Sequence, residues 1–456
     1  MKYRNVPCCL LLATLTAACG PLQTPASRFL ATEDSAPQSW KGNVFELSQN
    51  YPSTERVGGN YEWEDIDFKA EPHRFMESVK RYLLEGNLVA DWDVGENTVR
   101  TWYHAPWMHT GVNGREFVRG LTRERSSFPK ELHENQESCW QNWAVAFYNH
   151  EGGQTLQQVW EDHVNPDPGK SEFATGAMAA KLLFTQASVD EVPYLSNSLT
   201  WKANIHEQVD DVSNQENGYK RVLEDLRLLQ VDIAVKVEDK ATGWVFGTYI
   251  YKELSYSEDP WDNVHPVGIM WGNDPELTAE RYAAGDRVAE TWINPAWERV
   301  RFLGYHGRLN GPVDNPKSSC LSCHSTSQWP MRANLAPDGK LPTQMWFRNL
   351  KHPEPFTEGA VSTDYSLQIA LGIQNFRAHE QGLGAPFNNV LDCTPPDAPS
   401  ALAESISVES SQPTTISVEP HVLGLPDLQE PENIELEQVP VETSEILEDE
   451  VYPIHR

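Results

Sequence analysis

Two cysteines and a histidine stand together in the last third of the 456-residue chain, in the segment Cys320-Leu321-Ser322-Cys323-His324. This C-x-x-C-H spacing is typical of covalent c-type haem attachment. Two thiols on one helical turn can each form a thioether to a porphyrin vinyl group, and the adjacent imidazole becomes the axial ligand of the iron. At this composition about 0.003 chance matches are expected. We therefore predict one covalent haem c, held by Cys320 and Cys323, with His324 on the iron.

Two other interpretations of the motif are a disulfide and a zinc pair. Disulfides are common in exported chains, but a C-x-x-C pair is redox-active and suits a structural role poorly. A zinc site needs further Cys or His ligands nearby, and the next histidine after His324 is His352. Both alternatives are therefore less favoured than haem.

The first 18 residues have the form of an export signal, with a positively charged start and an apolar stretch too short to span a bilayer. The cysteine that follows, Cys19, stands after two alanines and resembles the lipidated cysteine of a bacterial lipobox. The alternative is an ordinary secretory signal cleaved near Ala18. We predict an exported lipoprotein anchored at Cys19, facing the periplasm or the surface. Gly20, which is not acidic, favours the outer membrane.

The chain after this signal divides into four parts by composition. The C-terminal part contains 14 Asp and Glu residues and one Arg, with repeated Pro and Ser, so we predict that it is disordered. The sequence does not fix the boundary between the two globular parts. The four parts are a lipid-anchored tether at 19–58, the N-terminal part of the globular region at 59–170, a haem c-binding region at 171–393 and an acidic tail at 394–456.

The formal net charge of −30 constrains the partners. Nucleic acid is excluded, because neutralising phosphates needs clustered Lys and Arg. An acidic surface suits a basic redox partner protein, and a small-molecule substrate is the other partner that a haem protein implies.

Alternating or wholly apolar runs predict strands, and amphipathic runs predict two peripheral helices. The stretch 239–243 contains a turn signal between the last two strands. The fold class we expect is α+β, mainly antiparallel sheet with peripheral helices, carrying a covalently attached haem and followed by the disordered acidic tail. The predicted strands are 98–103, 143–148, 177–185, 226–237 and 244–251, and the helices are 71–84 and 366–376.

Residues 170–330 resemble a known group of small β-sheet c-type cytochromes. The sequence FATGAMAAK at 173–181 is similar to a P-x-G-x-x-x-x-K strand of that group, with Ala174 in place of proline. VDIAVK at 231–236 followed by ATGWVFG at 241–247 is similar to its hairpin, and the haem motif follows in both. The group includes hydroxylamine-oxidising cytochromes with a lysine cross-linked to haem, and β-sheet relatives of cytochrome c′. The chain as a whole resembles bacterial monohaem c-type cytochrome-domain lipoproteins.

The resemblance implies an antiparallel sheet that supports one haem, with His324 as the sole strong axial ligand and an open distal pocket. It also makes Lys181 the counterpart of the haem-proximal lysine. The alternative for Lys181 is an edge-strand lysine that faces solvent. The distal carboxylate of the oxidising cytochromes has no counterpart here, so the resemblance does not supply their substrate.

The sixth iron ligand is not evident from the sequence. Met345 is the methionine with enough separation from His324 to reach round a porphyrin, and otherwise it is a core residue beside Trp346. A second histidine, His306, His352 or His379, is a further option. Because each alternative is weak, an open or water-occupied position is the single state we favour, which points to ligand binding or catalysis.

Two cysteines of the globular region remain, Cys139 and Cys393. In an oxidising compartment leftover cysteines usually pair, so we predict a Cys139–Cys393 disulfide, with two free buried thiols as the alternative.

Two other clusters draw attention. Residues 114–125 are rich in Arg, which can clamp haem propionates or form surface Arg–Glu pairs. Residues 102–109 are rich in aromatic and His side chains, which can line a pocket or simply form core.

The sequence therefore predicts an exported, lipid-anchored monohaem c-type cytochrome with extracytoplasmic redox activity. The two roles within that prediction are electron transfer and small-molecule oxidoreduction at an open haem iron, the second being a haem-dependent oxidoreductase. A cell-surface binding module with a structural haem is the alternative from another class.

Overall fold

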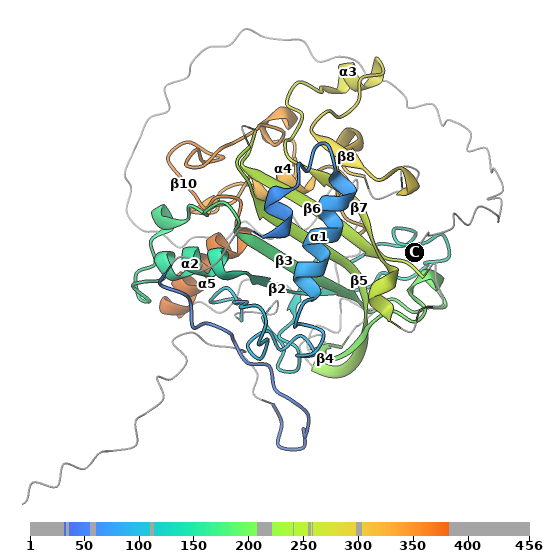
Figure 1. Cartoon of the computed structure of the whole chain (residues 1–456), viewed down its shortest axis with the longest axis vertical. Helices are drawn as coiled ribbons and strands as arrows, with labels where there is room; N and C mark the ends of the chain where they lie inside the picture. Colours follow the sequence, from blue (N-terminus) through green and yellow to red (C-terminus); the bar gives the residue numbers. More distant parts are fainter. Residues whose placement is uncertain are drawn as a thin grey trace, which may run out of the picture. The chain divides into compact units, whose positions relative to one another are not determined.

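An eight-stranded antiparallel sheet organises the protein, with strands in the order β1-β2-β3-β5-β6-β7-β8 (Figure 1). The strand β4 also pairs with β5. Because Arg227 of β5 pairs with Thr185 of β3 on one edge, its pairing with Thr200 of β4 must be on the opposite edge, the one that β6 pairs with further along β5. The strands are β1 Thr122–Arg123, β2 Asn142–Tyr148, β3 Met178–Thr185, β4 Thr200–His206, β5 Arg221–Lys236, β6 Trp244–Tyr251, β7 Val264–Met270 and β8 Thr291–Ile293.

The structure is a computed structural model. It describes residues 32, 36–54, 61–109, 114–207, 221–239, 241–253, 257, 259–297 and 303–382. The predicted signal at 1–18, Cys19, Cys393 and the predicted tail at 394–456 lie outside these residues. Within them, no helix combines the length and apolarity that a bilayer crossing requires.

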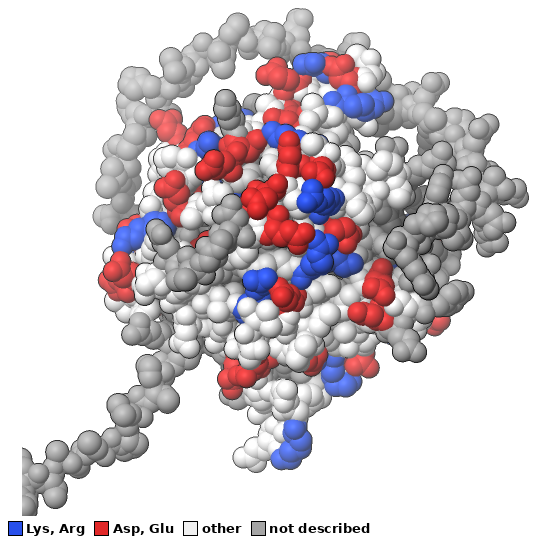
Figure 2. Space-filling model, in the orientation of Figure 1, with Lys and Arg blue, Asp and Glu red and all other residues white. Residues whose placement is uncertain are grey.

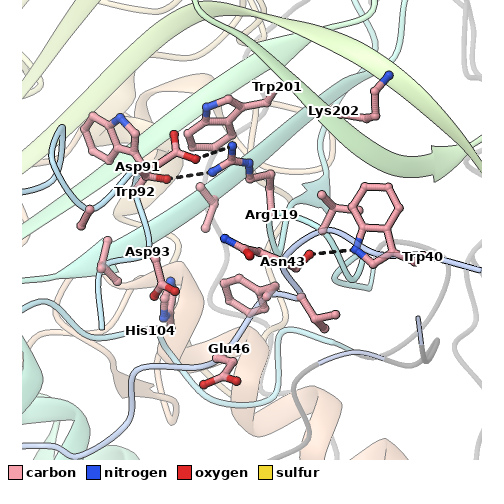
Figure 3. A pocket seen from close by; sticks show the side chains of 16 residues that line it. Trp40, Asn43, Glu46, Asp91, Trp92, Asp93, His104, Arg119, Trp201 and Lys202 are labelled. Carbon is pink, nitrogen blue, oxygen red and sulfur yellow. Dashed lines mark hydrogen bonds and ion pairs between the residues drawn. The ribbon is translucent and has the colours of Figure 1, made fainter. Parts of the chain in front are cut away.

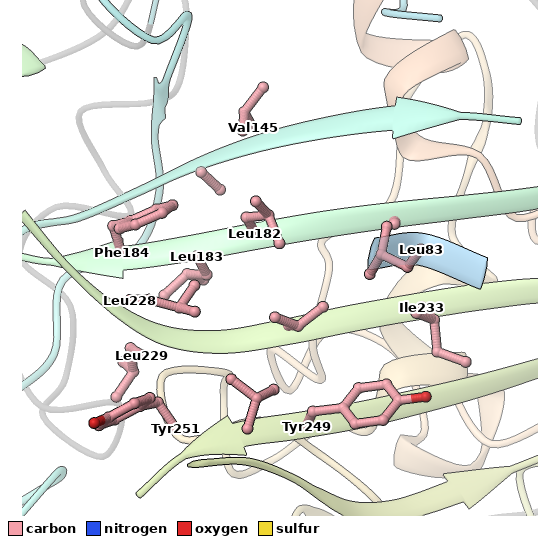
Figure 4. Packing of buried hydrophobic residues seen from close by; sticks show 14 of the residues in the cluster. Leu83, Val145, Leu182, Leu183, Phe184, Leu228, Leu229, Ile233, Tyr249 and Tyr251 are labelled. Atoms are coloured by element: carbon pink, nitrogen blue, oxygen red, sulfur yellow. The ribbon is translucent and has the colours of Figure 1, made fainter. Parts of the chain in front are cut away.

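One face of the sheet is apolar and is covered by α1, Pro72–Leu84, which begins with a proline at its first turn. Figure 1 shows this helix lying across the central strands. A stripe of helix residues that includes Leu83 packs on Leu182, Ile233 and Tyr249 (Figure 4). The Tyr249 hydroxyl donates to the carbonyl oxygen of Met76 at 2.7 Å, which fixes the helix over β6.

The opposite face carries the helices α2, His150–Val159, and α5, Leu367–Glu380, together with the single turn α4, Cys320–His324. Trp160 at the end of α2 contacts Phe376 of α5, with ring centroids 5.8 Å apart. A second apolar cluster fills this face and includes Phe246 of β6 and Leu321 of α4. All eight residues of β6 are buried because both faces are covered.

The predicted antiparallel sheet and most of its elements are confirmed. Strands at 143–148, 177–185 and 244–251 match β2, β3 and β6 to within one residue, and β5 begins five residues before the predicted 226. Glu71 and Ser366 are the N-caps of α1 and α5. β2 and β3 pair along their lengths across the predicted division at residue 170.

The strand predicted at 98–103 is wrong. The side-chain oxygen of Asn97 accepts from the backbone N–H groups of Val99 and Arg100, which curls the segment into a turn. Only Tyr103 joins a strand, through a bridge to Tyr148. Trp102 and Tyr103 are buried side by side in the core, whereas Val99 is 54% exposed.

The late part of the predicted tether contacts the globular region. The backbone N–H of Ser48 donates to Nδ1 of His104 at 3.1 Å, and the Tyr51 hydroxyl donates to the His104 carbonyl. Residues 36–54 are therefore part of the packed structure.

Truncation of a core side chain tests the assignment of the α1 face. Leu182→Ala should lower the free energy of unfolding by about 2–5 kcal/mol, because Leu182 is fully buried beneath α1. Leu223→Ala on β5 is the matched control: its leucine is 42% exposed, and the expected change is within about 0.5 kcal/mol. Urea denaturation of both variants makes the comparison, and equal losses would contradict the assignment.

Candidate cofactor-attachment site

The motif Cys320–His324 forms one helical turn with a reciprocal cap. The Ser319 hydroxyl accepts from the backbone N–H of Ser322 at 3.1 Å, and the Ser322 hydroxyl accepts from the N–H of Ser319 at 2.7 Å. This capping box defines the start of the turn. Leu321 is fully buried in the core of this face, and residues three apart on a helix share one side. Cys320 and Cys323 therefore face the same way.

Both cysteines of the motif are free thiols and are half-buried. Burial raises the pKa of Cys323 to about 12, and burial together with the charges of Asp314 and Asp232 holds the pKa of Cys320 well above its usual range. Redox-active C-x-x-C pairs instead have a lowered thiol pKa, because the thiolate is the reactive form. The pKa shifts of both thiols here are in the opposite direction.

The imidazole of His324 is held in one orientation. Its Nδ1 lies 2.9 Å from the carbonyl oxygen of Tyr365, and a carbonyl only accepts, so Nδ1 carries the proton. The Phe246 ring packs against the imidazole with centroids 4.7 Å apart. Burial lowers the pKa of His324 to about 4, so the ring is neutral near pH 7. The lone pair of Nε2 is then available to a metal.

The Tyr365 carbonyl is placed by an unusual backbone conformation. Asp364 and Tyr365 have φ angles of 45° and 67°, in the left-handed region that bulky residues rarely adopt. Such residues cost about 1–3 kcal/mol and persist where the surroundings fix them. The Tyr365 hydroxyl is held too, donating to the carbonyl oxygen of Leu350 at 2.7 Å.

The surroundings that fix this turn converge on the Asp364 carboxylate, which is 0% exposed. Lys236 of β5 donates to both oxygens at 2.8 and 2.7 Å, and the Trp244 indole of β6 donates at 2.9 Å. The backbone N–H of Phe173 also donates at 2.9 Å. Two strands and a loop thus lock the residue that precedes Tyr365.

A polar row crosses the same face of the sheet and ends at the motif. Lys181, Asp232 and Thr248 occupy paired positions on β3, β5 and β6. The Lys181 ammonium lies 3.2 Å from Asp232, the Thr248 hydroxyl donates to Asp232 at 3.0 Å, and that hydroxyl lies 3.9 Å from the Cys320 sulfur. Because β3 lies between β2 and β5, Lys181 is not on an edge strand.

Lys181 is held in its charged form. Burial alone lowers its pKa, but the carboxylates of Asp232, Glu124 and Asp314 outweigh burial and raise the pKa above its ordinary value. The structure therefore brings together Lys181, Cys320, Cys323 and His324, which the sequence analysis named separately.

The candidates for a sixth ligand have different surroundings. Met345 packs with the separate apolar cluster that contains Trp346. His306 stacks on Tyr282, with ring centroids 4.6 Å apart, and His379 makes a tilted contact with Trp107 at 5.0 Å. His352 is half-buried in a turn. In the described structure, no hydrogen bond or ring contact joins any of these four side chains to His324.

Cys139 is disulfide-bonded. Its predicted partner, Cys393, lies outside the described residues, so the Cys139–Cys393 pairing stays a prediction.

The Arg-rich segment 114–125 is committed to protein contacts. Arg115 is buried and donates to the carbonyl oxygens of Gly120 and Ala105. Arg125 pairs with Glu131 at 2.7 Å and also donates to the carbonyl of Val313. The segment 102–109 is core: Trp102, His104 and His109 are all nearly fully buried.

A cavity of about 240 Å³ lies near the α1 face of the sheet, where strand β4 and residues 36–54 meet (Figure 3). Its central cation, Arg119, is already bound: the guanidinium pairs with Asp91 at 2.8 Å and stacks on Trp201 at 4.7 Å. The other face of Trp201 stacks on Phe184. The sequence analysis missed this cavity because segments far apart in the chain line it.

Within the described residues, no group of three or more His, Cys, Asp or Glu side chains is arranged to hold a metal ion. The donor set at the motif is instead two thiols and one oriented neutral imidazole. That set fits a porphyrin attached by two thioethers, with one protein ligand to its metal.

Comparison of the chain with protein-family models, with curated proteins and with solved structures finds no match. The resemblance to β-sheet c-type cytochromes therefore stays a prediction that rests on the residues quoted above.

Removing the Asp364 carboxylate should disrupt the site. Asp364→Ala leaves Lys236 buried without its counter-ion, and breaking a buried pair costs about 3–5 kcal/mol. Asp225→Ala, from the exposed Lys202–Asp225 pair, is the control and should cost at most about 1 kcal/mol. Thermal or urea unfolding measures both, and a small loss for Asp364→Ala would contradict the role given to this residue.

Proposed function

We propose that this chain is an exported, lipid-anchored monohaem c-type cytochrome that acts in extracytoplasmic redox chemistry. Cys320 and Cys323 would carry the haem through thioethers, and His324 would be its axial ligand. Cys19 would carry the lipid anchor, which places the protein at the periplasmic side or surface, in the outer membrane.

The observation that carries the proposal is the tautomer of His324. Its Nδ1–H is bound to the Tyr365 carbonyl at 2.9 Å, which leaves Nε2 as the basic nitrogen. Metal-bound histidines almost always donate their other N–H to a carbonyl, a carboxylate or water. The two free thiols next to this imidazole complete the donor set.

The residues of the chain have separate tasks in this proposal. Bound haem c supplies a one-electron Fe(III)/Fe(II) couple. Tyr365 orients the imidazole, Asp364 holds Tyr365, and Phe246 packs against the imidazole ring. Lys181 and Asp232 place charge beside the attachment point.

Of the two roles, oxidoreduction or ligand binding at an open iron is favoured over electron transfer. Met345, one of the ligands that an electron carrier could use, packs with Trp346 in a separate apolar cluster. An open position on the iron allows a small molecule to bind. The partner would then be a small-molecule substrate, with a redox partner protein to exchange electrons.

The surface gives limited information about a partner protein. Figure 2 shows acidic side chains lying among basic ones on the face that carries α1, and several of them are ion pairs, such as Arg74–Glu71 and Arg81–Glu62. A basic partner would therefore meet a mixed surface on this face.

A cell-surface binding module with a structural haem is the alternative. Residues 59–170 cannot be tested for binding by themselves, because β2 pairs with β3 along its length. A binding test therefore needs the whole protein. Redox inertness of the holoprotein would favour this alternative.

Peptide mass spectrometry of protein matured with a haem c assembly system tests the attachment. We expect the peptide that contains Cys320 and Cys323 to carry the mass of one haem, and Cys320→Ser to leave a single thioether. Met345→Leu is the control, which should keep both the haem and the wild-type absorption spectrum. Recovery of both thiols without haem would contradict the proposal.

A further inference from the structure

The Lys181–Asp232 pair beside Cys320 is more enclosed than the Lys202–Asp225 pair, which also joins two strands of this sheet. Lys181 and Asp232 side chains are 26% and 20% exposed, whereas Lys202 and Asp225, which pair across β4 and β5, are 50% and 57% exposed. Enclosed charges interact more strongly and are screened less by salt than surface charges. The charges of Lys181 and Asp232 therefore act on neighbouring groups over a longer range than those of Lys202 and Asp225.

Asp232 is positioned by several donors besides the lysine. Gln230 donates to both of its oxygens, at 2.8 and 2.7 Å, and Thr248 donates at 3.0 Å. Thr248 in turn touches the Cys320 sulfur at 3.9 Å. The carboxylate is thus one side chain away from the atom that would join the porphyrin.

We propose that the Lys181–Asp232 pair sets the reduction potential of the haem, Asp232 lowering it and Lys181 raising it. This inference rests on the proposed function. A fixed negative charge favours the more positive Fe(III) state, and a fixed positive charge favours Fe(II). The ion pair also keeps Lys181 as a free ammonium, so its nitrogen forms no bond to the porphyrin.

Carboxylates near Lys181 determine how the loss of each member of the pair changes the local charge. Glu124 and Asp314 lie near enough to Lys181 for their charges to act on it as well. Loss of Lys181 leaves the Asp232 carboxylate without its counter-ion. Loss of Asp232 removes the carboxylate that contacts Thr248 at the attachment point.

Redox titration of holoprotein tests the inference with variants that keep side-chain size. Lys181→Met should shift the Fe(III)/Fe(II) equilibrium about tenfold toward Fe(III), and Asp232→Asn about tenfold toward Fe(II). For a one-electron couple each shift is about 59 mV, downward for the first and upward for the second. The double variant should return close to the wild-type potential, which keeps the test informative if one single variant folds poorly.

Lys202→Met and Asp225→Asn are the matched controls, since they remove the same charges from the same sheet at an exposed pair. They should leave the potential unchanged. Shifts of one sign for both site variants, no shift, or a haem peptide that also contains covalently bound Lys181 would overturn the inference while leaving haem attachment intact. Wild-type protein that matures without haem would instead overturn the proposed function itself.

Discussion

The hydrogen bond from Nδ1 of His324 to the Tyr365 carbonyl is the interaction on which the proposed site depends. It selects one tautomer, fixes the ring plane and leaves Nε2 free, and its length is 2.9 Å. The acceptor is a backbone atom in a left-handed conformation, so its position depends on the buried carboxylate of Asp364. Lys236 and Trp244 bind that carboxylate from two central strands. The sheet therefore orients the histidine through a carbonyl that lies 41 residues further along the chain.

The two faces of the sheet have different tasks. Leu182, Ile233 and Tyr249 face α1 and form apolar core. Lys181, Asp232 and Thr248, each one position along the same strands, face the motif. Because side chains alternate along a strand, one register builds the core and the polar row together. A shift of one residue in β5 would exchange Asp232 with a core residue and destroy both.

The sequence was sufficient for the central strands and for the motif, but not for the parts that position it. Long apolar runs identify β3, β5 and β6, and C-x-x-C-H identifies Cys320, Cys323 and His324. The Tyr365 carbonyl is a backbone atom, so no side chain in the sequence marks it as an acceptor. Asp364 cannot be told from other acidic residues in the sequence, because its partners Lys236 and Trp244 come to it only in the folded sheet. Asp232 becomes the partner of Lys181 only through strand register. The three-residue strand β8 lacks a distinctive pattern. Strand β4 alternates buried and more exposed residues along TWKANIH, a strand signal that the sequence analysis missed, and the segment 98–103 pairs only at Tyr103.

The most direct test of this account is an absorption spectrum of protein matured with a haem c assembly system, recorded oxidised, reduced, and reduced under carbon monoxide. The account predicts a haem c spectrum that is high-spin and shifts with carbon monoxide, since in the proposal His324 would supply one ligand and Met345 packs with Trp346. A low-spin spectrum that carbon monoxide leaves unchanged would contradict the open iron. Protein without haem absorption would contradict the central claim.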